Sequence, residues 1–148
     1  MPERRLASAY RAAEESPGLL LWRVTNTWQA EQRAALAPFG LTHVQFVLLA
    51  SLTWLDADGP VTQRHLADSA RTDPMMTSQV LRALEGKGLV ARTPHPTDAR
   101  AKALTVTAAG AALANRANEA VEAVDRRFFG RLGAEVDALT RLLRALAG

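Results

Sequence analysis

The sequence predicts a mainly α protein (α+β) that contains one short β-hairpin among its helices. Three observations lead to this fold class. Two short helix-like segments follow one another between residues 62 and 85, and Gly86 and Gly88 end the second. Two strand-like runs then flank a proline-containing loop, and longer apolar-patterned segments lie on both sides of the whole stretch. Two helices followed by a hairpin arm have the plan of a winged helix-turn-helix.

The length and composition indicate one globular domain. A chain of 148 residues is long enough to bury a sizeable core, and 48% hydrophobic with 22% charged residues is typical of globular proteins. No window approaches the roughly 18 apolar residues of a membrane span, and the first residues lack the apolar region of a secretory signal. We therefore expect a cytoplasmic protein. Without cysteine, the chain has no disulfides, thiolate metal ligands or cysteine-based redox sensing.

The first half of the chain predicts two helices. Apolar residues recur at helical spacing from Leu19 to Leu36, and Pro38 and Gly40 end this segment. Thr42 is a suitable N-cap for a second helix over residues 43–55, which is apolar on nearly every face. A helix that is hydrophobic all round is normally buried, so we expect this one to lie centrally.

The two short helices have recognisable caps. Thr62 can cap a helix that extends to about Ser69. Either Thr72 or Asp73 can cap the next, with Pro74 near its first position, where the missing N–H does no harm. On a helical wheel, the side of this second helix that we expect to pack inward carries Met76, Val80, Leu81, Ala83 and Leu84.

A hairpin and two more helices complete the predicted order. Gly86 and Gly88 suit left-handed backbone, residues 89–93 and 102–106 are strand-like, and the loop between them is rich in proline. Thr107 can cap a long helix that extends to about residue 129. Its apolar face is predicted to contain Leu113, Ala117, Ala120, Val121, Val124 and Phe128. The final amphipathic helix follows residues 130–133 and carries Val136, Leu139, Leu142, Leu143 and Leu146.

The surplus positive charge is concentrated in the predicted winged helix. Residues 62–104 contain seven basic and four acidic side chains, whereas the rest of the chain has 11 of each. A local surplus of cations is what the release of counterions from nucleic-acid phosphates requires. Unevenly distributed, solvated charge is the other explanation for three extra cations.

The second short helix has an outward face with the chemistry of base recognition. Arg82 can donate two hydrogen bonds to guanine, and Gln79 can pair with adenine. On the same face, Ser78 is compatible with either base and Met75 can contact a thymine methyl group. An ordinary surface helix with a polar outer face is the alternative.

The hairpin loop offers a second contact with DNA. Arg100 lies near its tip and can enter a narrow minor groove, while Asp98 can form the turn or hold a cation in position. His95 and Lys102 can add phosphate contacts. A solvated hairpin without a partner is the alternative. The complete set of candidate DNA-contacting residues is Thr62, Gln63, Thr72, Met75, Ser78, Gln79, Arg82, His95, Asp98, Arg100 and Lys102.

Five fragments, in this order and spacing, resemble the MarR-type transcriptional regulators, a family named for multiple antibiotic resistance. They are Leu41–Phe46, Leu66-Ala67, Leu84–Val90, Asp98-Ala99-Arg100 and Leu104–Gly110. The resemblance covers most of the chain and implies a single MarR-like domain over residues 1–148. It implies dimerisation helices in residues 1–40 and 108–148 and a winged helix-turn-helix in residues 41–107. It also implies a homodimer on a palindromic operator, with the reading helices about one DNA turn apart.

The resemblance further implies a repressor whose DNA affinity is modulated by a small, aromatic ligand. Aromatic and imidazole side chains of the first two helices could line a pocket for it, namely Trp22, Trp28, His43, Phe46 and Trp54. Packing in the core or at a dimer interface is the competing explanation for each of them. The three histidines lie in separate elements without metal-ligand spacing, so we expect no metal and no cofactor.

Two other functions remain open from the sequence. A non-specific architectural DNA-binding protein would share the electrostatics but would not prefer a palindrome. A helical protein-interaction module would not bind DNA. We do not expect an enzyme, because the chain has no paired acids in an evident cleft, no glycine-rich phosphate loop and no metal-binding spacing.

Overall fold

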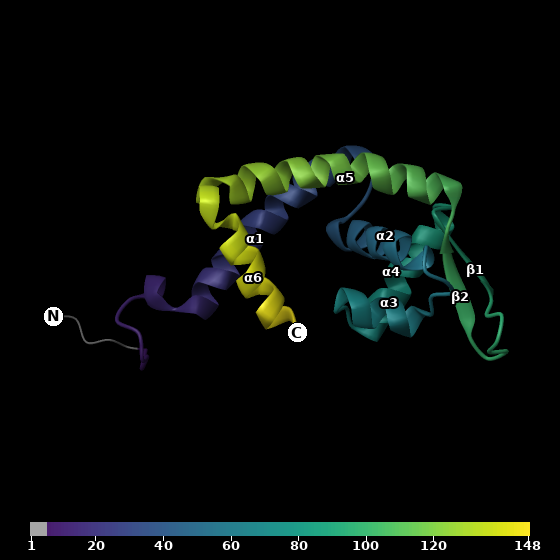
Figure 1. Cartoon of the computed structure of the whole chain (residues 1–148), viewed down its shortest axis with the longest axis horizontal. Helices are drawn as coiled ribbons and strands as arrows, with labels where there is room; N and C mark the ends of the chain where they lie inside the picture. The colour runs from purple at the N-terminus through teal and green to yellow at the C-terminus, as the bar shows by residue number, and fades with distance from the viewer. Residues whose placement is uncertain (1–5) are drawn as a thin grey trace.

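The computed structural model describes residues 6–148 and is built around α2, the apolar helix His43–Asp56 (Figure 1). It confirms the mainly helical fold with one two-stranded sheet and the predicted order of elements. The remaining elements are η1 (Ala13–Glu15), α1 (Pro17–Leu36), η2 (Ala37–Phe39), α3 (Gln63–Ala70), α4 (Pro74–Gly86), β1 (Val90–Pro94), β2 (Lys102–Val106), α5 (Ala108–Phe129), η3 (Gly130–Glu135) and α6 (Val136–Ala147).

The predicted N-caps form as their chemistry requires. The side-chain oxygen of Thr42 accepts from the Gln45 backbone N–H at 3.2 Å, and the Gln45 side chain accepts from the Thr42 N–H at 3.1 Å. This reciprocal pair is a capping box. Asp73, rather than Thr72, caps α4, with Pro74 at the first helical position. Thr62 and Thr107 cap α3 and α5 in the same way, so four helix starts follow from local sequence.

The helix α2 lies at the centre of the hydrophobic core, as predicted. Leu48, Leu49 and Leu52 are fully buried there. Fully buried leucines of α3, α4 and β2 belong to the same core, namely Leu66, Leu81, Leu84 and Leu104. Since these elements contribute to one core, α3, α4 and the hairpin are held around α2. Residues 43–106 together form the winged-helix unit.

The inward face predicted for α4 is partly wrong. Leu81 and Leu84 are buried and Val80 packs against the core, but Met76 is 42% exposed and Ala83 is also exposed. The fully buried residue near the start of the helix is Thr77 instead. Its hydroxyl donates to the backbone carbonyl of Asp73 at 2.8 Å, which satisfies the polar group inside the core.

The hairpin pairs antiparallel, with Val90 opposite Val106 and Pro94 opposite Lys102. The strand β1 therefore begins one residue later than predicted and includes Pro94. Of the two glycines before it, only Gly88 has left-handed backbone, with φ of 73°, because Gly86 still belongs to α4. Val61, just before α3, forms an additional bridge to Leu104, which widens the base of the hairpin.

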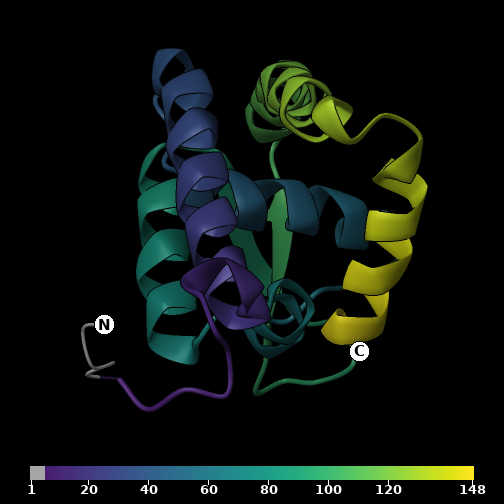
Figure 2. The ribbon, with the colours of Figure 1, turned by 90° about the vertical axis from the view of Figure 1, so that its left-hand side faces the viewer.

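The long helix α5 joins the two ends of the molecule (Figure 1). One end follows β2, and at the other end α1 packs beside it while α6 turns away. The turn lies in η3, where Gly133 has φ of 58°. In Figure 2, α1 and α6 stand on opposite sides of the view. Within residues 6–148 no single helix is long and apolar enough to cross a membrane. Only the bent pair Pro17–Phe39 and His43–Asp56 meets that criterion in length and composition.

The start of α5 is fixed closely to the end of α4. The Thr107 hydroxyl donates to the Gly88 carbonyl at 2.7 Å, and the Thr107 N–H donates to the Leu89 carbonyl at 3.0 Å. A Cβ atom on Gly110 would lie 2.1 Å from that same Leu89 oxygen. Only glycine fits at position 110 without displacing backbone, so α5 begins in direct contact with the winged-helix unit.

Candidate nucleic-acid interface

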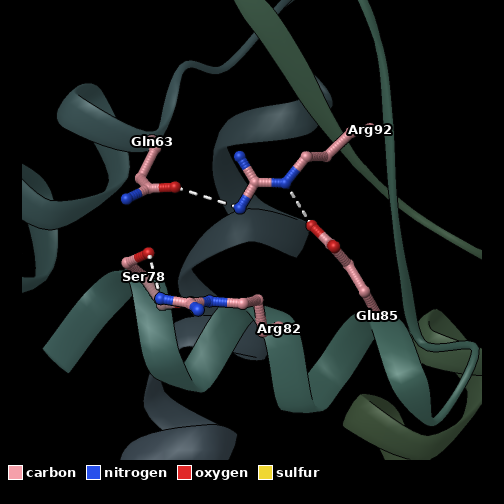
Figure 3. A network of polar contacts seen from close by, with 5 residues as sticks. All are labelled: Gln63, Ser78, Arg82, Glu85 and Arg92. Atoms are coloured by element: carbon pink, nitrogen blue, oxygen red, sulfur yellow. Dashed lines mark hydrogen bonds and ion pairs between the residues drawn. The ribbon is translucent and has the colours of Figure 1, made fainter. Parts of the chain in front are cut away.

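The outward face of α4 presents the predicted reading residues to solvent. Met75 is 73% exposed, and Gln79 and Arg82 are also exposed. The Arg82 guanidinium donates to the side-chain oxygen of Ser78 at 3.2 Å (Figure 3). Arg82 and Ser78 lie one helical turn apart, so this bond holds the arginine along the helix surface. The four side chains share one accessible face at the start and middle of α4.

An arginine of the hairpin connects three elements beside this face. Arg92 in β1 forms an ion pair with Glu85 of α4, and its Nη2 donates to the side-chain oxygen of Gln63 at 3.0 Å (Figure 3). Gln63 stands at the first position of α3. Because its oxygen is bound to Arg92, its amide N–H groups remain as donors. No specific role for Arg92 or Glu85 could be predicted from the sequence, since their meeting depends on the position of the hairpin.

Two other predicted contact residues have structural partners. The Thr62 hydroxyl accepts from the His65 N–H at 3.1 Å as the cap of α3. Thr72 is half-buried, and its hydroxyl lies 2.7 Å from that of Thr77. Since the Thr77 hydroxyl already donates to a backbone carbonyl, Thr72 is the donor in this pair. Its hydroxyl proton is therefore directed into the fold.

The hairpin loop is organised by two side chains that accept hydrogen bonds from nearby backbone N–H groups. The carboxylate of Asp98 accepts from the Arg100 backbone N–H at 3.0 Å, which is the turn-forming role considered for it in the sequence. The His95 Nδ1 accepts from the Asp98 N–H at 3.1 Å and from the Thr97 N–H at 3.2 Å. These contacts stabilise the loop. The side chains of Arg100 and Lys102 are exposed on it.

Three cations of the basic surplus are bound to other elements of the protein. Besides Arg92, Lys87 donates to the Gly40 carbonyl at 2.6 Å and to the Gln45 side chain at 3.1 Å. Arg71 donates to the Ala147 carbonyl at 3.2 Å, which ties the turn before α4 to the last turn of α6. The exposed cations that remain in the winged-helix unit are Arg64, Arg82, Arg100 and Lys102.

The five residues predicted to line an aromatic pocket are not brought together. Phe46 is 5% exposed in the core, whereas Trp22 and Trp54 are 68% and 82% exposed on α1 and α2. Only Trp28 and His43 meet, with ring centroids 5.2 Å apart in an edge-to-face arrangement. Within one subunit these five side chains do not line a common cavity, and the aromatic ligand pocket stays a prediction. The sequence placed these residues on two helices but did not show how the helices are rotated.

Trp28 and His43 belong to a polar contact between α1, α2 and α5. The Trp28 indole N–H donates to Asp125 at 2.8 Å, and the buried Gln32 amide donates to the same carboxylate oxygen at 2.9 Å. Burial lowers the pKa of His43, and the charge of Arg33 lowers it further against an opposing effect of Asp125. Gln32 and Asp125 lie 93 positions apart, so no local pattern in the sequence predicts that they meet.

A separate open cleft lies between α2 and α5. It has a volume of about 260 Å³ and combines the ring of Trp54 with the side chains of Thr53, Asn115 and Asn118. Apolar walls with a few polar groups are typical of small-molecule sites. Among residues 6–148, no group of three His, Cys, Asp or Glu side chains is placed to hold a metal ion.

The terminal helices expose many apolar side chains in the isolated subunit. No residue of α6 is buried. The large hydrophobic residues exposed on α1, the η3 turn and α6 are Leu20, Leu21, Trp22, Val24, Leu132, Leu142, Leu143 and Leu146. Apolar surface gathered on two helices in this way marks an interaction surface.

Comparison with known proteins identifies the family. A model of the MarR family matches residues 41–102, which contain the helix-turn-helix and most of the hairpin. The HTH-type transcriptional regulator YdcH of Bacillus subtilis is 44% identical over 123 residues, covering 82% of this chain and 84% of YdcH. The chain belongs to the MarR family. Both the predicted family and the predicted winged-helix fold are thereby confirmed.

Other MarR-family proteins support a DNA-binding role. The HTH-type transcriptional repressor Rv2887 of Mycobacterium tuberculosis is 41% identical over 82% of this chain and 86% of its own length. The crystal structure of Rv2887 in complex with DNA matches with a TM-score of 0.71 and 37% identity, covering 90% of this chain and 98% of that one. The present chain, like these relatives, is a DNA-binding transcriptional regulator and not an enzyme.

A further MarR-family structure contains a small molecule. CouR from Rhodococcus jostii RHA1, bound to p-coumaroyl-CoA, matches with a TM-score of 0.82 and 30% identity. The match covers 93% of this chain and 96% of CouR. The fold of this regulator is therefore shared both with a DNA complex and with a ligand complex.

Proposed function

We propose that this regulator is a repressor that binds a palindromic operator as a homodimer, in the cytoplasm together with the DNA. The observation that carries the proposal is the exposed reading face of α4 beside an arginine-tipped hairpin, with apolar helices left uncovered at the other end. Two-fold pairing through those helices would place two reading faces on one side of the dimer. Their expected separation is about one DNA turn, roughly 34–36 Å.

Dimerisation is supported by the exposed leucines of α1 and α6. Burying each leucine or valine side chain stabilises an interface by roughly 1.5–3 kcal/mol. The same helices contact each other little within one subunit, because α6 leaves α5 through the η3 turn. A second copy offers a matching surface, since the apolar face of one subunit is also present on the other.

In the proposed complex α4 enters the major groove. Arg82 and Gln79 read base edges there, while Met75 contacts a thymine methyl group. Rotation of Arg82 away from Ser78 costs two exposed hydrogen bonds, which water can replace, so the guanidinium is available to guanine. Arg100 enters the minor groove, and Lys102 and the amide of Gln63 bind phosphates. His95 and Asp98 shape the loop that carries Arg100.

The test is binding to a palindrome from the promoter region of the protein's own gene, measured by mobility shift at fixed salt. Arg82→Ala and Arg100→Ala should each weaken binding by about fivefold to a hundredfold, as expected for a base contact of about 1–3 kcal/mol. Arg116→Ala, an exposed arginine on α5, is the matched control and should bind like the wild type. Wild-type affinity in both test variants would refute the contact assignment.

Binding to the palindrome and to a scrambled duplex also distinguishes the proposed regulator from two other functions. An architectural DNA-binding protein would bind a scrambled duplex as tightly as the palindrome and give no discrete footprint. A protein-interaction module would bind neither duplex at low salt. Four exposed cations around the reading surface are few for an architectural role, which favours the sequence-specific regulator.

We propose that the cleft between α2 and α5 holds an aromatic effector that lowers operator affinity. The cleft sets the Trp54 ring beside the amides of Asn115 and Asn118. CouR, which shares the fold, is bound to p-coumaroyl-CoA. Titration with hydroxycinnamic acids and their thioesters should quench tryptophan fluorescence and release operator DNA. Asn118→Leu should abolish both responses, whereas Asn26→Leu on α1 should leave them unchanged.

A further inference from the structure

The sulfur atoms of the described chain are confined to the DNA-reading helix. The protein has three methionines and no cysteine. Met75 and Met76 occupy the first turn of α4 and are 73% and 42% exposed, whereas Met1 lies outside the described residues. Among residues 6–148 the hydrophobic residues of the buried core are leucine, valine, alanine and phenylalanine, without methionine. An oxidant that reacts with thioethers therefore reaches sulfur at the reading face and not in the core.

We propose that Met75 is an oxidation site through which a peroxide releases the protein from its operator. The proposal rests on the function proposed above, in which Met75 faces DNA. Its thioether is well exposed, and its neighbour Met76 is the less exposed of the two. Exposure governs how readily a methionine is oxidised in a folded protein.

The reaction needs only hydrogen peroxide as co-reactant. The thioether sulfur attacks one peroxide oxygen and forms the S–O bond of methionine sulfoxide, while the O–O bond breaks. The sulfur gives two electrons to the peroxide, and the other oxygen leaves as hydroxide. This hydroxide takes the proton that remains on the oxygen bound to sulfur and becomes water. The product side chain is polar and has a strong hydrogen-bond acceptor at its end.

A sulfoxide at position 75 is unfavourable against DNA for two reasons. It replaces an apolar group that would contact a thymine methyl, and it directs an acceptor oxygen at bases and phosphates that carry acceptors of their own. Each subunit of a dimer carries one such site. We expect operator affinity to fall at least about tenfold, which corresponds to the loss of one base contact.

The fold should tolerate the modification. The first turn of α4 is held by the Asp73 side chain, which accepts from the Met76 N–H at 2.9 Å, and by the Thr77 hydroxyl bond to the Asp73 carbonyl. The helix is anchored in the core by Leu81 and Leu84, both fully buried. None of these contacts uses the Met75 side chain. Oxidation would therefore change the reading surface while the winged helix stays folded.

The experiment compares wild-type protein, Met75→Leu and Met76→Leu before and after treatment with hydrogen peroxide. Mass spectrometry of peptides measures sulfoxide at each position, circular dichroism checks the fold, and a mobility shift measures operator binding. In the wild type we expect sulfoxide at Met75 and about tenfold weaker binding. The Met75→Leu protein should bind before and after treatment with equal affinity, while Met76→Leu should respond like the wild type.

Two additions make the outcome decisive. Methionine sulfoxide reductase should restore binding of the oxidised wild type, and prior binding of operator DNA should slow oxidation of Met75. If Met75 stays unoxidised, or if fully oxidised protein binds as before, the proposal is overturned. Failure of the proposed function appears separately, as untreated wild-type protein that does not bind the palindrome.

Discussion

The winged-helix unit and the terminal helices differ in how far their apolar side chains are buried. In the winged-helix unit Leu48, Leu81 and Leu104 are fully buried by neighbours from the same chain. In α6 no residue is buried, and Leu146 is 81% exposed although the helix is amphipathic. The difference teaches that the winged-helix unit buries its core within one chain, while α6 keeps an apolar face that the second copy would cover in the proposed dimer.

The largest expected effect comes from removing a side chain of the reading unit's core. Leu104→Ala should lower the free energy of unfolding by about 2–5 kcal/mol, because Leu104 is fully buried where β2 meets α2 and Val61. Urea unfolding followed by circular dichroism measures this. Leu6→Ala removes the same atoms at a position that is 78% exposed and should change stability little. Equal losses in the two variants would remove the contrast between buried and exposed leucines.

The next effect concerns association rather than folding. Leu142→Glu combined with Leu146→Glu places charge on the apolar face of α6. We expect the dimer to dissociate, with the dissociation constant raised at least about a hundredfold, since each lost leucine contact is worth roughly 1.5–3 kcal/mol. Light scattering gives the mass, and circular dichroism should show unchanged helix content.

Matched changes on the polar face of α6 provide the control for this prediction. Arg141→Glu combined with Arg144→Glu introduces the same two glutamates and should leave the dimer intact. A double-leucine variant that remains dimeric would show that the second copy does not cover this face of α6. A variant that unfolds would show that α6 supports the subunit itself.

A smaller effect is expected where the hairpin is tied to the recognition helix. Arg92→Ala removes the ion pair with Glu85 and the bond to Gln63, so the hairpin loses its link to α4 and α3. Operator affinity should fall roughly twofold to fivefold, as for other partly exposed ion pairs. Hydroxyl-radical footprinting should show weaker protection at the flanks touched by the hairpin and retained protection at the half-site centres. Arg92→Lys should restore part of the flanking protection, and equal loss at both places would contradict a positioning role.

The smallest expected effect is a pH dependence of stability that arises at His43, where α2 meets α1. Burial lowers the pKa of His43 below its ordinary value of 6.5. As the pH falls below 6.5, the unfolded chain therefore takes up a proton at this position before the folded protein does, and stability decreases. The decrease ends below the folded-state pKa. Thermal unfolding of His43→Gln should depend less on pH over this interval than the wild type, and identical slopes would exclude His43 as a contributor.

The parts of the fold that follow from local chemistry could be predicted from the sequence. Thr42, Thr62 and Thr107 each cap the helix that they precede, because an N-cap needs only backbone N–H groups within three residues. The pattern of residues 43–55, which is apolar on nearly every face, likewise predicts the central position of α2. The reading face of α4 followed from the helical period, since its polar side is simply the side away from Leu81 and Leu84.

Features that depend on distant contacts could not be predicted. Lys87 contributes to the basic surplus of residues 62–104, yet it binds the Gly40 carbonyl, 47 positions away. The burial of Thr77 depends on Thr72 and Asp73 satisfying its hydroxyl, which no hydrophobic pattern shows. The predicted aromatic pocket groups residues of α1 and α2 by the type of their side chains. Their separation is set by the rotation of each helix against α5, as the Trp28–Asp125 bond illustrates.

The close approach of Gly110 to the Leu89 carbonyl has a mechanical consequence. Because only Thr107 separates β2 from α5, a tilt of this helix at the η3 turn would carry the hairpin with it. At about 1.5 Å per residue, the 22 residues of α5 span about 33 Å. A tilt of about 6° at η3 would then move the hairpin by about 3.5 Å, close to the rise of one DNA base pair. In the proposed complex, a tilt of this size at η3 would be enough to move the hairpin by one base pair along the DNA.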